Sequence, residues 1–163
     1  MKKTGQLFLF IAIICWAGIF GAFLYSHIAT MPSLLSHLPE SSVLANGPYP
    51  VKDEAFWKMI HPVTILFTVL ALITNWKINN RRKLIGVAMI IYILALVATF
   101  TYFVPELMEF FKSNQNTTIT ATEWYERGQT WQHLSWIRGA FMFLGFILML
   151  LALTKNYSGE NKK

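Results

Sequence analysis

The sequence predicts an all-α integral membrane protein: one domain, an antiparallel four-helix bundle, with both termini cytoplasmic. Of its 163 residues, 55% are hydrophobic and only 13% are charged, whereas a soluble domain carries about 25% charge. Four apolar runs approach the roughly 20 residues that a spanning helix needs. The basic residues gather at one end of these runs, which the positive-inside rule identifies as the cytoplasmic side.

The apolar runs span residues 7–25, 62–76, 84–104 and 139–154. The second and fourth reach full length if their helices continue outward through 56–61 and 131–138. We therefore expect helices over residues 6–30, 55–76, 84–111 and 124–154, with outer loops over 31–54 and 112–123. The first run exceeds the roughly 7–15 residues of a signal-peptide core, so we expect it to remain as an uncleaved helix.

The net charge of +6 follows this topology. Nine of the fourteen basic residues fall on the expected inner side: Lys2, Lys3, Lys77, Arg81, Arg82, Lys83, Lys155, Lys162 and Lys163. Seven of the eight acidic residues fall on the other side: Glu40, Asp53, Glu54, Glu106, Glu109, Glu123 and Glu126. The basic excess is therefore a topology signal and does not indicate nucleic-acid binding. The only cysteine, Cys15, excludes an intrachain disulfide and CxxC redox chemistry.

Small residues mark one face of the first helix. Ala17 and Gly21 stand four residues apart, as do Gly18 and Ala22, a spacing that lets helices approach closely. Tyr25 continues this face four residues beyond Gly21, so we expect it to pack inward.

Three prolines are expected to interrupt the helices. Pro32 should end the first helix, because the residue before a proline avoids the α region. Pro62 should start or kink the second helix, and Pro105 should end or kink the third, because each removes a backbone donor.

Polar side chains form stripes on the second and third helices. On the second helix, His61, Thr68 and Asn75 recur every seven residues, with Thr64 between the first two. The stripe on the third helix consists of Tyr92, Thr99, Tyr102 and Glu106. Both should face the bundle, because lipid offers hydroxyl and imidazole groups no hydrogen-bond partner.

The fourth helix contains a charge, Arg138, inside an otherwise apolar stretch. Such a charge costs about 2.5–3.5 kcal/mol to insert, so it should face other helices or a wet cavity. Trp131 and Ser135 share its face at helical spacing, whereas His133 does not. Counted at about 1.5 Å per residue, Arg138 lies roughly 24 Å and His61 roughly 22 Å above the inner helix ends.

These residues predict a polar pocket in the outer half of the bundle. Arg138 would stabilise an anionic or polarised oxygen of a small amphipathic molecule, and His61 would transfer a proton. The candidate substrate-binding residues are Tyr25, Thr64, Thr68, Tyr102, Glu106, Trp131 and Ser135. The alternative is an internal ion pair between Arg138 and Glu106 that only fixes helix register, and the sequence leaves this open.

A bound haem or copper ion is a further alternative, since imidazole and thioether groups suit copper and two helical histidines can hold a haem. The candidate metal ligands are His27, His61 and His133. No ExxH or HxxxH spacing is present, so the sequence assigns no cofactor.

Three short motifs occur in order along the chain: residues 21–26 with 31–34, Phe103-Val-Pro105, and Trp131 seven residues before Arg138. Together they resemble the signatures of the anthrone oxygenase-like family of small four-helix membrane proteins. The chain departs from the family pattern in two places. Glu106-Leu-Met follows the proline where asparagines are frequent, and Ser135 stands where Asn or His is common.

The resemblance implies a four-helix fold and cofactor-independent oxygenation of a phenolic or quinone-like molecule, since some fungal members are linked to the oxidation of anthrones to anthraquinones. A non-catalytic membrane subunit or assembly factor is the competing class, and the haem or copper protein is the third. Expected partners are the lipid bilayer and a small hydrophobic ligand, with homo- and hetero-oligomers both open. The expected location is the inner (plasma) membrane of a bacterium.

Overall fold

The computed structural model describes residues 2–50 and 53–155, so Lys162 and Lys163 of the inner basic group lie outside the described residues. The described residues form helices and loops without a strand. The stretches long and apolar enough to cross a membrane are Lys3–Leu35, Glu54–Thr74, Asn79–Phe111 and Ala121–Leu153. This confirms the prediction of an all-helical chain with four membrane-length helices.

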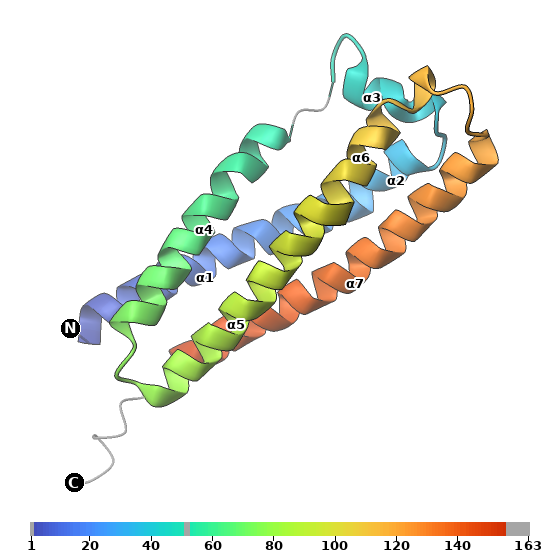
Figure 1. The fold of residues 1–163 in the computed structure, drawn as a ribbon. Coiled ribbons are helices and arrows are strands. Elements are labelled where there is room, and N and C mark those ends of the chain that lie inside the picture. The colour runs from blue at the N-terminus through green and yellow to red at the C-terminus, as the bar shows by residue number, and fades with distance from the viewer. Residues whose placement is uncertain (1, 51–52, 156–163) are drawn as a thin grey trace, which may run out of the picture.

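The elements in the first half of the chain are α1 (Lys2–Tyr25), the π-helical segment η1 (Ser26–Thr30), α2 (Met31–Leu35), η2 (Glu40–Ser42), α3 (Val43–Asn46) and α4 (Glu54–Thr74). Those in the second half are α5 (Asn79–Ala98), the π-helical segment η3 (Thr99–Phe103), α6 (Val104–Phe111), η4 (Ser113–Gln115) and α7 (Ala121–Leu153). α1 packs along both α4 and α7, and α5 packs along α7. The start of α1, the α4–α5 turn and the end of α7 lie together (Figure 1). We call this the inner end, and the end with α2, α3 and α6 the outer end.

Two apolar cores stabilise this arrangement. The inner core joins the four long helices through residues such as Leu9, Trp16, Ile85 and Met149. The outer core forms where the segment after α1 folds against α6 and α7, and it includes Leu35, Phe110, Trp124 and Trp131. Much of the expected outer loop 31–54 is therefore short helix, and α2 is packed against the end of the bundle.

Pro32 does not end the first helix, contrary to the prediction. In η1 the Met31 N–H donates to the Ser26 carbonyl, five residues back, and the chain continues as α2. Pro32 lies in the first turn of α2, where a missing N–H costs little. The same arrangement recurs at Pro105, which follows η3 in the first turn of α6. Pro62 lies within α4.

Arg81 lies in the predicted basic loop but is only 7% exposed. Its guanidinium donates to the carbonyls of Lys155 and Leu153 at 2.7 and 3.4 Å and to Asn75 Oδ1 at 3.1 Å. Asn75 in turn donates to the Gly5 carbonyl at 2.8 Å. Arg81 therefore ties the inner ends of the long helices together, besides contributing to the charge pattern.

The contact between α1 and α7 depends on Gly139, where an added Cβ would overlap the Phe23 ring. Gly139→Ala is expected to destabilise the protein, because overpacking costs about 1–3 kcal/mol and exceeds the gain in helix propensity of about 1 kcal/mol. The control is Gly18→Ala, since Gly18 has nothing within 4 Å of that position. It should be neutral or stabilising. Thermal unfolding in detergent measures both, and equal melting temperatures would contradict the proposed close contact.

Candidate functional site

The two π-helical segments bring side chains of different helices to one face of α7. η1 supplies His27, and η3 supplies Thr99 and Phe103. All three contact Ser135 or Arg138 of α7. π-helical segments are rare and occur frequently at functional sites. The candidate site therefore lies at the level of η1 and η3.

Arg138 is held by two hydroxyl groups and an aromatic ring. Its Nη1 donates to Thr99 Oγ1 at 2.7 Å, and its Nη2 donates to Ser135 Oγ at 2.9 Å. The guanidinium carbon lies 4.0 Å from the centroid of the Phe103 ring, a cation–π geometry. Ser135 thus lies beside Arg138, as its spacing in the sequence predicts.

His27 continues a chain of hydrogen bonds that begins at Arg138. Its Nδ1 lies 3.0 Å from the Phe23 carbonyl, and because a carbonyl only accepts, Nδ1 carries the ring proton. Nε2, 2.6 Å from Ser135 Oγ, therefore accepts the hydroxyl proton in the neutral imidazole. The Ser135 oxygen in turn accepts from Arg138. Both nitrogens of His27 are thus engaged.

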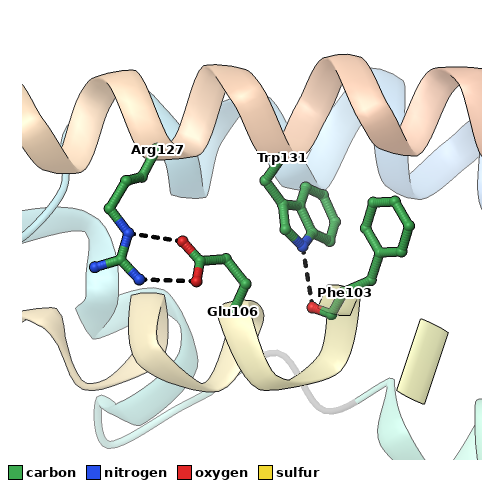
Figure 2. Close-up of polar contacts among 4 residues, drawn as sticks. All are labelled: Phe103, Glu106, Arg127 and Trp131. Atoms are coloured by element: carbon green, nitrogen blue, oxygen red, sulfur yellow. Dashed lines mark hydrogen bonds and ion pairs between the residues drawn. The ribbon is translucent and has the colours of Figure 1, made fainter. Parts of the chain in front are cut away.

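Trp131 forms an aromatic wall of the site and is 3% exposed. Its ring is nearly parallel to that of His27, with centroids 5.8 Å apart, and edge-on to that of Phe103 at 5.7 Å. Its Nε1 donates to the Phe103 carbonyl at 3.0 Å, which locks the indole against η3 (Figure 2).

No carboxylate of the described residues lies within ion-pair distance of Arg138. Glu106, which the sequence left open as its partner, accepts two hydrogen bonds from Arg127 instead, at 2.7 and 2.8 Å (Figure 2). The Arg127 guanidinium also lies 4.6 Å from the centroid of Trp124. The alternative of an Arg138–Glu106 ion pair is thus not realised, and the contacts of the Arg138 guanidinium within the described part of the chain are with the neutral groups of Thr99, Ser135 and Phe103.

Tyr102 and Glu106 belong to a separate surface hollow of about 410 Å³ between α6 and α7. Its lining residues are Tyr102, Glu106, Ile119, Glu123, Glu126, Arg127 and Thr130. Arg138 is not among them. Two of the predicted substrate-binding residues are therefore separated from the polar cluster around Arg138.

His61 lies on α4 and makes its own contacts. Its Nδ1 is 2.7 Å from the Tyr92 hydroxyl, and its ring stacks on Trp57 with centroids 5.6 Å apart. Arg138, in contrast, is hydrogen-bonded to Thr99 and Ser135. The two predicted catalytic residues, Arg138 and His61, therefore lie on different helices and have separate hydrogen-bond partners.

The two threonines predicted to bind substrate are buried and already hydrogen-bonded. Thr68 accepts from Trp16 Nε1 at 3.1 Å, and Thr64 donates to the Ile60 carbonyl at 2.8 Å. Their exposed fractions are 1% and 0%. In this structure they order the interior between α1, α4 and α5 and do not face an open pocket.

Tyr25 points away from the site and is 70% exposed. Gly18 and Gly21, which suggested that this face packs inward, have no neighbour within 4 Å of the place where a Cβ would lie. The expected inward packing of Tyr25 is wrong, because the close approach uses glycines of α7. Trp16 of α1, for example, would lie 2.7 Å from a Cβ at Gly145.

The metal-ligand candidates do not converge. Within residues 2–50 and 53–155, no three His, Cys, Asp or Glu side chains lie close enough together to hold a metal ion. Both nitrogens of His27 have partners, and His133 is exposed. The three histidine candidates are therefore not gathered into one such group among the described residues.

Some contacts of the site are not predicted by the sequence. The sequence predicts His27 only as a metal ligand, and Tyr92 and Thr99 only as members of a polar stripe. It does not predict a role for Arg127, although the spacing of four residues from Trp131 places both on one face of the helix. That spacing was the available signal for a second arginine competing for Glu106.

The fold and the site define a helical protein with four membrane-length helices and an arginine, where three of them meet, that has no carboxylate partner among the described residues. No family model, curated protein or solved structure matches this chain.

Proposed function

We propose that the protein is an integral membrane protein of a bacterial inner membrane, an antiparallel four-helix bundle with cytoplasmic termini. The basic residues of the α4–α5 turn support this orientation through the positive-inside rule. Because the only cysteine, Cys15, is buried, introduced cysteines can test it. Tyr49→Cys, at a position 95% exposed near the outer end, should react with a membrane-impermeant maleimide in intact cells. Lys77→Cys should react only after permeabilisation, and the reverse pattern would contradict the orientation.

The proposed function is to bind a small hydrophobic molecule, phenolic or quinone-like, by an oxygen atom at Arg138. The charge of Arg138, which has no carboxylate partner within the described residues, carries this proposal. A guanidinium has five N–H donors, and the described residues accept from two of its nitrogens. A charge in a membrane-length helix costs about 2.5–3.5 kcal/mol, and an intramembrane ionisable residue is a functional-site hypothesis by default.

The surroundings of Arg138 suit an aromatic ligand. Phe103 lies against the guanidinium, and Trp131 presents a large apolar ring at the same level. Ligand sites are mostly apolar with a few placed polar groups. The polar groups here are Arg138 and the Ser135–His27 pair, and in the proposal His61 of α4 completes them.

The resemblance to the anthrone oxygenase-like family supplies a reaction for this proposal. His61 removes a proton from a methylene group next to a ring carbonyl, and Arg138 stabilises the charge that develops on the carbonyl oxygen. Dioxygen adds to the carbanion, and the proton returns from His61 to give a hydroperoxide. Loss of water then leaves a second carbonyl. The methylene and O₂ thus become a carbonyl and H₂O, and dioxygen accepts all the electrons.

Binding of tritiated 1-naphthol by the detergent-purified protein, measured by scintillation proximity, tests the site. The wild type should bind saturably and Arg138→Met should not. Arg127→Met is the matched control, because Arg127 lies on the same helix but is paired with Glu106. Equal binding by Arg138→Met and wild type would remove Arg138 from the site. Absence of binding by the wild type, together with co-purification of a fixed partner, would favour the non-catalytic subunit.

A further inference from the structure

A second hollow, which the proposed function does not use, lies at the inner end of the bundle, where the start of α1 and the end of α7 come together (Figure 1). Its volume is about 450 Å³. Its lining residues are Lys3, Gln6, Leu7 and Phe10 of α1 and Leu153 of α7. Ligand sites are mostly apolar with a few polar groups, and this lining has that composition.

The lining changes from polar to apolar along one face of α1. Lys3, Gln6, Leu7 and Phe10 follow one another at spacings of three, one and three residues, which keeps them on the same side of the helix. Leu7 and Phe10 are more than half exposed although both are large and apolar. Because α1 is long and apolar enough to cross a membrane, the polar pair lies toward the headgroups and the apolar pair toward the acyl chains.

The hollow lies in a strongly positive part of the molecule. The basic residues of the inner end within the described ranges are Lys3, Lys77, Arg81, Arg82, Lys83 and Lys155, and no acidic residue of those ranges lies there. Arg81 brings this charge to the α7 side of the hollow, because its guanidinium donates to the Leu153 carbonyl at 3.4 Å. The electrostatic field therefore attracts an anion to the polar end of the lining.

We propose that this hollow binds an acidic phospholipid of the membrane. The phosphate accepts hydrogen bonds from the Lys3 ammonium and the Gln6 amide, both of which are donors. An acyl chain covers Leu7 and Phe10. Basic pockets between membrane helices are known to bind anionic headgroups. This inference rests on the proposed membrane insertion but is independent of any ligand at Arg138, which does not line the hollow.

The two halves of the lining together favour a lipid over other occupants. A soluble phosphate matches the polar pair but leaves Leu7 and Phe10 uncovered. A purely apolar molecule covers those two side chains but gains nothing from the positive charge. An acidic phospholipid joins an anionic group to apolar chains in the order in which α1 presents its cation and its apolar side chains.

Native mass spectrometry of the full chain in detergent tests the headgroup. The probes are phosphatidylglycerol and phosphatidylcholine with identical acyl chains, added in equal amounts, and the wild type should retain phosphatidylglycerol in preference. Lys3→Gln should lower phosphatidylglycerol binding about fivefold, the effect of one basic residue near a membrane surface. Lys83→Gln is the matched control, because it removes the same charge from the same end outside the hollow. Equal losses in both variants would assign the binding to the general charge of the inner end and overturn the site.

A second pair of variants tests the apolar half without changing the charge. Leu7→Trp fills the hollow and should lower phosphatidylglycerol binding at least as much as Lys3→Gln. Ile73→Trp is its control, because Ile73 lies near the inner end of α4, is 61% exposed against 55% for Leu7, and does not line the hollow. Equal binding by the two tryptophan variants would contradict the proposed position of the acyl chain.

Two further measurements separate this inference from its alternatives. Glycerol 3-phosphate, which has the anionic group without acyl chains, should not displace the lipid, and displacement would assign the hollow to a soluble phosphate. Arg138→Met should retain phosphatidylglycerol, and Lys3→Gln should retain 1-naphthol, since the two sites share no residue. If the wild type binds both phospholipids equally, the inference is wrong, whatever the naphthol measurement shows.

Discussion

Replacing Arg138 with methionine is expected to raise the melting temperature of the protein while it abolishes the binding of 1-naphthol. The charge has no carboxylate partner among the described residues, and a charge within a membrane-length helix costs about 2.5–3.5 kcal/mol that an apolar side chain does not. The hydroxyls that Arg138 contacts keep their own bonds. Thr99 donates to the Ala95 carbonyl at 2.7 Å, and Ser135 donates to His27. Methionine also fills most of the volume of the arginine stem.

Whether the melting temperature of Arg138→Met rises or falls distinguishes a ligand site from a structural network. If Arg138 only holds helices together, its removal should lower the melting temperature, as removal of Arg127 should. Arg127→Met leaves the largely buried carboxylate of Glu106 without its two hydrogen bonds and should therefore be destabilising. Scanning fluorimetry in detergent compares both variants with the wild type. A drop in melting temperature for Arg138→Met with naphthol binding unchanged would contradict the proposed site.

The four membrane-length helices could be predicted because long apolar runs and clustered charges are local properties of the sequence. The course of the helices around the prolines could not be predicted. The first and third spans continue through Pro32 and Pro105 because η1 and η3 precede those prolines. Proline alone favours an interruption. A π-helical segment persists where packing against other helices holds it, and that packing is absent from the local sequence.

In the site, too, contacts between residues close in sequence could be predicted, whereas contacts between different helices could not. Ser135 and Arg138 could be placed together because three residues along a helix bring side chains onto one face. The partner of Glu106 could not be chosen in this way, since it depends on how α6 and α7 are rotated against each other. Two arginines on α7 were available, and the structure pairs Glu106 with Arg127. The prediction that Tyr25 packs inward was wrong for the same reason. Residue spacing defines a face of a helix but does not show which neighbouring helix covers that face.

Replacing Arg81 with alanine is expected to cause the largest loss of stability among the inner-end variants. The substitution removes hydrogen bonds to the carbonyls of Lys155 and Leu153 and to Asn75 Oδ1. Each buried group that loses its partner costs about 1–3 kcal/mol. The loss also removes a cation from the carbonyl end of α7, where the helix dipole favours positive charge. We expect a decrease of about 3 kcal/mol in the free energy of unfolding, measured by thermal and denaturant unfolding in detergent.

Arg82→Ala is the control that isolates this effect. It removes one positive charge from the same turn, so any effect on membrane orientation is matched. Arg82 donates to Asn79 Oδ1 at 2.9 Å and lies over the ring of Trp76, and both contacts are at the surface. Exposed substitutions of this kind usually change stability by about 0.5 kcal/mol or less. If the two variants lose the same stability, the inner end is held by its charge pattern. A loss confined to Arg81→Ala means that hydrogen bonds from one buried guanidinium hold the helix ends together.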